Sequence, residues 1–183
     1  MCIRDSAEAQ NELGLLYLSG KLGTADSPAG IAWLTRAAQG GNAQARNNLA
    51  TLYERGIGGV SKNLDNAGQL YSLAANQGHG PATLALARLI NDGVGTKANP
   101  IKAWALATLA VERGEKEAAK LVKEINDKLD DKQRAEAVKE LENIKTGKSA
   151  KKDDAKKDDA KKDGTRKDPV KPAGKETKPK TPK

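Results

Sequence analysis

The sequence predicts an all-α protein, an α-solenoid of short helix-turn-helix repeats followed by a disordered C-terminal tail. Three observations predict this fold class. One pattern of apolar and small residues returns every 36 to 37 residues, and its spacing within each unit is helical. The composition then changes sharply near Gly147, which leaves about 140 residues to form a core.

Each unit begins with a predicted helix that carries its apolar residues on one side. After an alanine, apolar residues follow at four and seven positions, the spacing of a single helical stripe. The alanines are Ala9, Ala45, Ala82 and Ala118, followed by Leu13, Leu49, Leu86 and Val122, and then by Leu16, Leu52, Leu89 and Ile125. Small residues beside the stripe allow a neighbouring helix to approach closely, and a glycine is expected to end each helix in the left-handed conformation. The small residues are Gly14, Ala50 and Ala87, and the glycines are Gly20, Gly56 and Gly93.

A second helix is predicted in each unit, over residues 31–39, 67–77 and 101–113. Its stripe combines a large apolar residue with an alanine four positions later, and a glycine ends the helix before the next unit begins. The large residues are Trp33, Leu70 and Leu106, the alanines Ala37, Ala74 and Ala110, and the glycines Gly41, Gly78 and Gly114.

The pattern AxxxLGxxYxxG, a Gly-rich loop, and a second helix ending in AAxxG resemble the Sel-one-like repeat family, which is related to the tetratricopeptide repeats. The resemblance covers residues 7–146 and places repeats at 9–44, 45–81 and 82–117, with a degenerate end at 118–146. It implies a right-handed superhelix whose first helices line a concave groove. It also implies a non-catalytic scaffold for protein-protein interaction.

The last part of the folded region is expected to cap the solenoid. In the fourth unit, Asn126 and Leu129 stand where the pattern has tyrosine and glycine. Residues 131–145 then predict a capping helix, with Asp130 and Asp131 at its N-terminus. We expect its buried stripe to consist of Ala135, Val138, Leu141 and Ile144.

The two ends of the chain are expected to lie outside the fold. Residues 1–6 carry no periodicity and no signal-peptide pattern, so we interpret them as a translation artefact or a disordered segment. A truncated N-terminus leaves the compartment unknown and favours a bacterial periplasmic or otherwise exported location over the cytoplasm. Residues 147–183 hold 14 lysines and arginines against 7 acidic residues, and Val170 is their only large apolar residue, which predicts disorder.

The sequence offers no candidate catalytic, cofactor-binding or metal-binding residues. Cys2 is the only cysteine, and His79 is the only histidine, placed in a predicted turn without a metal-ligating or catalytic partner. The glycines at Gly56 and Gly93 follow helices, whereas phosphate-binding loops follow strands. We therefore predict no enzyme, no cofactor and no small-molecule substrate, with an unrecognised hydrolase as the remotest alternative.

The predicted function is a scaffold that holds a partner peptide or protein in the groove of the first helices. Polar side chains between the consensus positions suit hydrogen bonds to a peptide backbone or carboxylate. The candidate groove residues are Asn11, Asn47, Thr51, Glu54, Arg55, Arg88, Asn91 and Asp92. The alternative is a binder of anionic surfaces (membrane, nucleic acid or cell-wall polymer) that acts through the basic tail.

Overall fold

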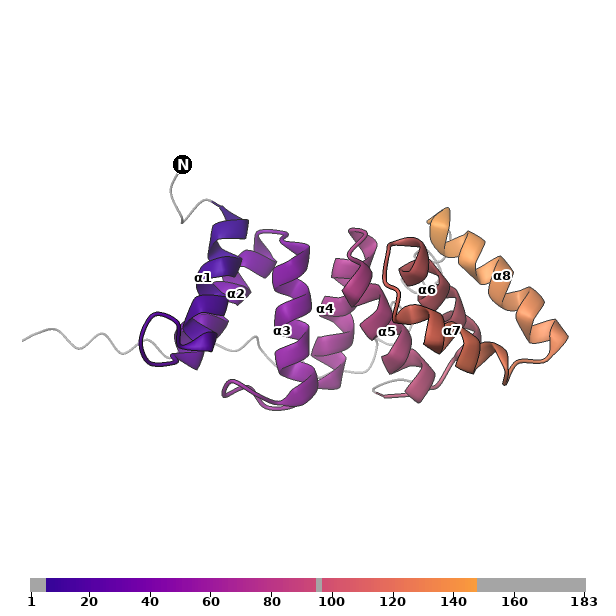
Figure 1. Cartoon of the computed structure of the whole chain (residues 1–183), viewed down its shortest axis with the longest axis horizontal. Coiled ribbons are helices and arrows are strands. Elements are labelled where there is room, and N and C mark those ends of the chain that lie inside the picture. The colour runs from indigo at the N-terminus through magenta and orange to yellow at the C-terminus, as the bar shows by residue number, and fades with distance from the viewer. Residues whose placement is uncertain (1–5, 95–96, 148–183) are drawn as a thin grey trace, which may run out of the picture. The chain divides into compact units, whose positions relative to one another are not determined.

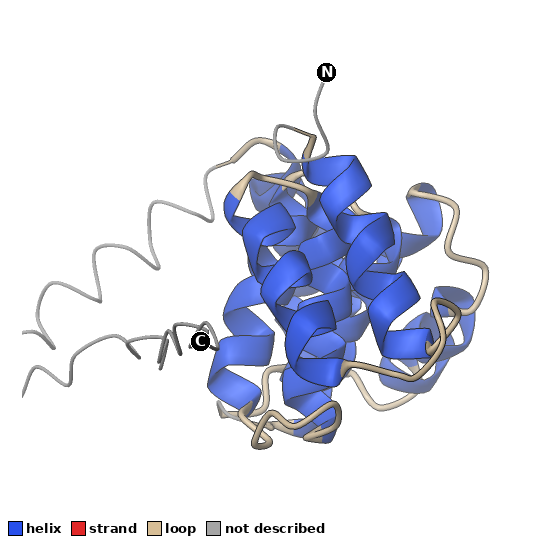
Figure 2. Ribbon diagram, turned by 90° about the vertical axis from the view of Figure 1, so that its left-hand side faces the viewer, coloured by secondary structure: helices blue, strands red, loops and turns tan. Residues whose placement is uncertain are grey.

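The computed structural model describes residues 6–94 and 97–147, and this part of the chain forms eight α-helices and no strand (Figures 1 and 2). The helices are α1 (Ala7–Ser19), α2 (Ser27–Gln39), α3 (Ala43–Arg55), α4 (Leu64–Asn76), α5 (Gly80–Asp92), α6 (Pro100–Glu112), α7 (Ala118–Asn126) and α8 (Asp131–Lys145). The predicted all-α solenoid is confirmed. The predictions for residues 1–6 and 147–183 fall outside the described residues, except at Ser6 and Gly147.

The first helices begin and end at equivalent positions of their repeats. Their N-cap residues Ser6, Asn42 and His79 each accept a hydrogen bond from the backbone N–H three residues further on. Gly20, Gly56 and Gly93 end these helices with φ values of 69°, 67° and 67°. Only glycine adopts this conformation readily, so the predicted helix ends are confirmed.

The repeats pack in series. Each first helix packs on the second helix of its own repeat, and each second helix packs on the first helix of the next. The α1–α2 crossing depends on two glycines, because a Cβ at Gly14 would lie 2.9 Å from Leu34 Cγ and 3.0 Å from the Gly30 carbonyl oxygen. The predicted role of Gly14 in close approach is therefore confirmed.

Alanine columns form the centre of the packing between helices. Fully buried alanines stand at the start of three first helices and near the end of three second helices. They are Ala45, Ala82 and Ala118, and Ala37, Ala74 and Ala110. Because these side chains are small, neighbouring helices approach closely, and larger residues such as Leu34 and Leu49 fill the space beside them.

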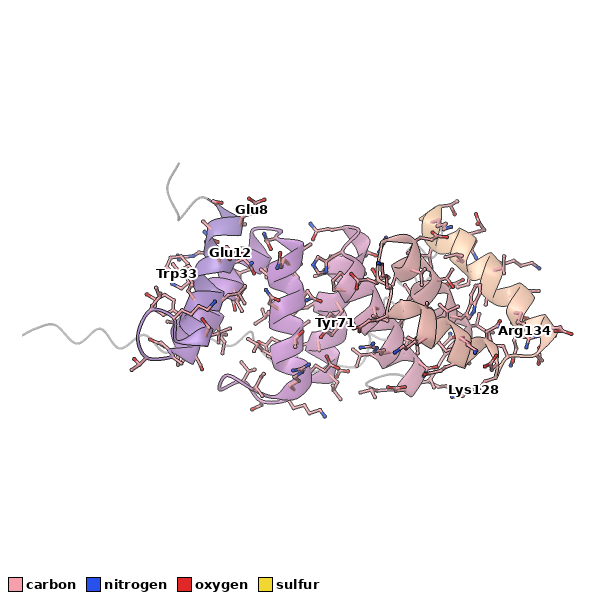
Figure 3. All side chains as sticks on the ribbon, viewed as in Figure 1. Glu8, Glu12, Trp33, Tyr71, Lys128 and Arg134 are labelled. Atoms are coloured by element: carbon pink, nitrogen blue, oxygen red, sulfur yellow. The ribbon has the colours of Figure 1, made fainter. Side chains whose placement is uncertain are left out.

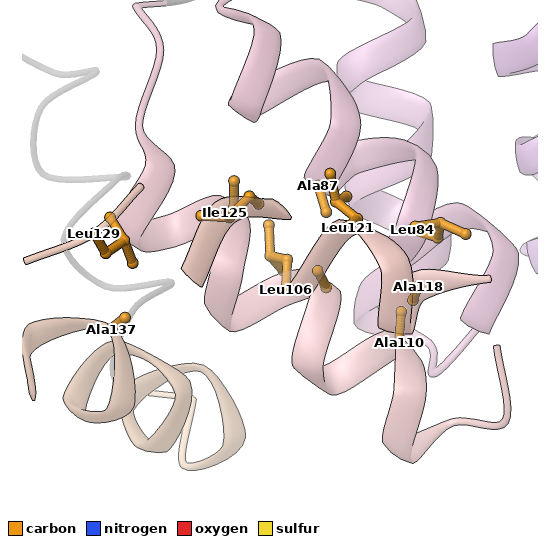
Figure 4. Close-up of a cluster of buried hydrophobic side chains, with 11 residues drawn as sticks. Leu84, Ala87, Leu106, Ala110, Ala118, Leu121, Ile125, Leu129 and Ala137 are labelled. Carbon is orange, nitrogen blue, oxygen red and sulfur yellow. The ribbon is translucent and has the colours of Figure 1, made fainter. Parts of the chain in front are cut away.

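The C-terminal helix α8 closes the solenoid, but its buried stripe differs from the predicted one. Asp130 caps α8 as predicted, and Gln133 completes a capping box that was not predicted. However, the predicted stripe is wrong at Ala135, which is exposed, and at Val138, which is 50% exposed. Leu141 is buried as predicted, and Ala137, which was not predicted, is buried as well. The helix packs mainly on α6. It is rotated about its own axis relative to the predicted orientation, so that Ala137 faces the core (Figure 4).

Candidate partner-binding site

The predicted groove residues of α3 lie on the side of the helix that the core does not use. Asn47, Thr51 and Arg55 follow one another every four residues and so share one face of α3. The opposite face buries Leu49 and Leu52 against α2. The polar side chains are therefore left partly or fully exposed.

A buried tyrosine links two of the predicted residues. Tyr71 lies on α4 (Figure 3). Its hydroxyl donates a hydrogen bond to Glu54 Oε2 at 2.7 Å and lies 3.0 Å from Thr51 Oγ1. Burial raises the pKa of Tyr71 well above its ordinary value, so the phenol keeps its proton and holds the Glu54 carboxylate in place. Tyr71 itself is 2% exposed.

The link between Tyr71 and the polar face was missed by the sequence analysis. The equivalent positions hold Leu34 and Ala107, which have no hydroxyl to satisfy. A tyrosine in such a buried column needs a hydrogen-bond partner, and that need is the signal that could have pointed to Thr51 and Glu54.

The predicted residues of α5 form a second, more exposed group. Arg88, whose side chain is 54% exposed, lies 3.6 Å from Glu117 Oε2. Asn91 donates a hydrogen bond to Asp92 Oδ1 at 3.0 Å. These contacts lie at the surface, where such pairs contribute little stability, so the side chains can exchange them for contacts with a partner.

Asn11 lies apart from the other predicted residues. It is 2% exposed, and its Oδ1 accepts a hydrogen bond from Asn48 Nδ2 at 3.0 Å, which joins α1 to α3. Leu84, in the same column of the repeat, is also buried. Asn47, the third residue of this column, is half-buried. The remaining residues define the polar face, which consists of Asn47, Thr51, Glu54 and Arg55 on α3 and Arg88, Asn91 and Asp92 on α5.

A cleft on the other side of α3 was not predicted from the sequence. It lies between α2 and α4, with α3 as its floor, and has a volume of about 390 Å³. Leu49 and Tyr53 line the floor, and Leu70 and Leu73 line the α4 wall. This α2–α4 cleft was missed because the sequence shows the stripes of single helices but not the gap between two second helices.

In residues 6–94 and 97–147, no three His, Cys, Asp or Glu side chains are grouped so that they could hold a metal ion. His79 caps α5 through Nδ1, which accepts the Ala82 N–H at 3.2 Å. None of the eight described helices combines the length and the hydropathy needed to cross a lipid bilayer.

The helix pairs, their close junctions and the exposed polar face define an α-solenoid repeat protein. The sequence matches the Sel1 repeat in three consecutive units, residues 7–42, 43–79 and 80–115. The chain therefore belongs to the Sel1 repeat family. Each matched unit begins two residues before the boundary expected at 9, 45 or 82, at the first helical residue after the N-cap.

Two solved structures resemble this chain. The Sel1 repeat protein from Oxalobacter formigenes is 33% identical with a TM-score of 0.62, and the match covers 64% of this chain and 48% of that protein. Protein c5321, a protective antigen present in uropathogenic Escherichia coli strains displaying an SLR fold, is 26% identical with a TM-score of 0.70. That match covers 91% of this chain and 35% of the antigen. This chain thus spans about half or less of either protein.

The comparison with curated proteins finds no match. Membership of the family still gives the general class of function. Sel1 repeats are typically non-catalytic scaffolds that mediate the binding of protein partners.

Proposed function

We propose that this protein is a non-catalytic adaptor that binds an extended peptide segment of a protein partner along the polar face. The observation that carries the proposal is the set of partly or fully exposed polar side chains on consecutive first helices. Three pairs of them hold corresponding positions, namely Thr51 and Arg88, Glu54 and Asn91, and Arg55 and Asp92. Asn47 and Thr51 supply amide and hydroxyl groups, and Arg88 supplies a guanidinium. An extended peptide presents carbonyl and N–H groups at regular intervals, which such a set can hydrogen-bond.

The hydrogen bonds beneath the polar face support this proposal. Tyr71 fixes Glu54 through a short hydrogen bond and contacts Thr51. Side chains that are held in place before binding lose less conformational entropy when a partner docks, and they therefore bind it more tightly. The contacts of the Tyr71 hydroxyl thus support a binding role for Thr51 and Glu54.

The proposal is tested by capturing partners from the source cell with the full chain. Asn47→Ala and Arg88→Ala should each weaken capture of a specific partner, while Lys139→Ala, an exposed lysine on α8, should leave it unchanged. The affinity should depend only weakly on salt, because the acidic and basic residues of the polar face balance in number. Equal capture by all three variants would exclude the polar face as the binding site.

A second candidate function rests on the charge of residues 147–183, with 14 lysines and arginines against 7 acidic residues. This segment would bind an anionic surface, and affinity would fall steeply as salt rises because bound counterions are released. Removal of residues 148–183 separates the two functions. If capture requires the segment and disappears at high salt, the adaptor proposal is wrong and the tail is the binding element.

A further inference from the structure

The α2–α4 cleft has an apolar interior and an exposed apolar edge. Leu49 is 4% exposed at its floor, whereas Leu73 on the α4 wall is 48% exposed. Thr35 and Gln39 on α2 and Gln69 on α4 also line the cleft. An exposed leucine beside a cleft of about 390 Å³ is typical of a surface that binds apolar side chains of another molecule.

The next repeat shows what covers the equivalent surface. The residues of α6 that correspond to Gln69 and Leu73 are Ala105 and Leu109, each 36 positions further along the chain. These two side chains are 0% and 8% exposed and form a core cluster with Leu141 of α8. An amphipathic helix of the chain itself therefore lies on the face of α6 that α4 leaves open.

The contacts of α8 define the kind of helix that this face accepts. Ala137, Leu141 and Ile144 follow at four and three residues, and they make one apolar stripe that faces α6. Lys145 Nζ pairs with Glu112 Oε1 at 2.7 Å at one edge. Asn76 holds the position on α4 that corresponds to Glu112, so the open face lacks the carboxylate that selects a lysine there.

The charge of the cleft further restricts which kind of helix can bind there. Arg46 is the charged residue of its lining, and its guanidinium is already used: Nε donates to the Ala38 carbonyl at 3.0 Å, and Nη1 donates to Gln77 Oε1 at 2.8 Å. The other polar lining groups are uncharged. An occupant with charges on its contacting side would leave them desolvated and unpaired, which is costly.

We propose that the α2–α4 cleft and the exposed side of Leu73 bind an amphipathic α-helix of a protein partner, with an uncharged, leucine-rich contacting face. The helix lies on α4 as α8 lies on α6. This site is on the opposite side of α3 from the polar face, so it goes beyond the proposed adaptor function. The protein would then hold two segments at once, one on each side of α3.

The test uses a fluorescein-labelled, stapled helical peptide with leucines at positions i, i+4 and i+7 and only alanine and glutamine elsewhere. Fluorescence anisotropy should show saturable binding to the full chain. Leu73→Asp should lower the affinity at least about tenfold. Leu22→Asp is the matched control, because Leu22 is 55% exposed in the α1–α2 loop and away from the cleft. Circular dichroism should give both variants the helical content of the wild type.

Several outcomes would overturn the proposal. Binding that Leu73→Asp leaves unchanged, or that persists when serine replaces the leucines of the peptide, would place the peptide elsewhere. An absence of saturation at about 1 mM peptide would show that the cleft does not bind such a helix. Self-association of the wild type that Leu73→Asp abolishes would make a second copy the occupant. Peptide binding that appears only after removal of residues 148–183 would make the chain's own tail the occupant. Arg88→Ala should not affect the peptide, which separates this site from the polar face.

Discussion

At the residue scale, two arginines satisfy the same backbone group in successive repeats from different positions. Ala38 and Ala75 are equivalent, and their carbonyls lie at the ends of second helices, where each also accepts a backbone N–H of the turn, from Gly41 at 3.2 Å and from Gly78 at 2.9 Å. Arg46 Nε donates to the first carbonyl at 3.0 Å, and Arg113 Nη1 donates to the second at 2.9 Å. In the next repeat, Thr83 holds the position that corresponds to Arg46. The arginine that contacts the equivalent carbonyl therefore comes from a different position of the repeat.

Replacing Arg113 by alanine should lower the free energy of unfolding by about 1–3 kcal/mol, because the Ala75 carbonyl and Thr83 Oγ1 lose a charged donor. The double variant Thr83→Arg/Arg113→Gln copies the arrangement of Arg46 and Gln77 and should recover most of this loss. Urea unfolding measures both. A double variant no more stable than Arg113→Ala would show that the two arrangements are not interchangeable.

His79 makes the cap of α5 sensitive to pH. Its Nδ1 accepts the Ala82 N–H, and this requires the neutral ring. Burial lowers the pKa of His79 below its ordinary value of 6.5, and the charge of Glu115 opposes this shift only in part. The unfolded chain therefore binds the proton more readily, so this contribution to stability is complete above pH 6.5 and is lost as the pH falls below it.

His79→Asn should remove this dependence and keep the cap, since Asn42 holds the equivalent position and accepts the Ala45 N–H at 2.7 Å. The difference in unfolding free energy between wild type and variant, measured by urea titration at pH 5 and pH 7.5, isolates the histidine from all other groups. A difference that is the same at both pH values would contradict the assignment.

At the element scale, the sequence predicted the helices better than their starts. The predicted second helices began at residues 31, 67 and 101, where the apolar stripes begin. The observed helices begin three or four residues earlier in α2 and α4 and one earlier in α6, directly after the N-caps Asp26, Asn63 and Asn99. Capping depends on a polar side chain rather than on apolar spacing, so periodicity alone does not reveal it.

The same limit applies to the candidate site. Periodicity separated the polar face of α3 from its buried face, because both follow from helical geometry. It could not show that Tyr71 reaches Thr51 and Glu54, or that Asn11 is buried against Asn48, because these contacts join positions 17 to 37 residues apart. The α2–α4 cleft likewise depends on the distance between helices, which a sequence pattern does not contain.

The orientation of α8 gives a test at this scale. Leu141→Ala should lower the free energy of unfolding by about 2–5 kcal/mol, through lost burial and the cavity left against Ala105 and Leu109. Val138→Ala, at a side chain that is 50% exposed, should change it by less than about 0.5 kcal/mol. Thermal and urea unfolding measure both. A loss of stability on Val138→Ala as large as that on Leu141→Ala would restore the orientation predicted from the sequence.

At the scale of the whole molecule, the described part is held together by contacts between helices that are close in sequence. Its core divides into separate clusters along the sequence, and each draws on adjacent helices. The last junction is closed by α8, whose exposed side carries Val138 and charged residues. Every buried apolar residue of the described part precedes Thr146.

Removal of residues 148–183 should therefore leave the melting temperature within about 5 °C of the full chain, which corresponds to roughly 1 kcal/mol for a domain of this size. Helical content per residue of 6–147 should also be unchanged in circular dichroism. The segment holds most of the net charge of +8, so its removal should matter for binding to anions and not for folding. A melting temperature lower by more than 5 °C would mean that the segment packs on the repeats, and the solenoid and the tail would then have to be treated as one folding unit.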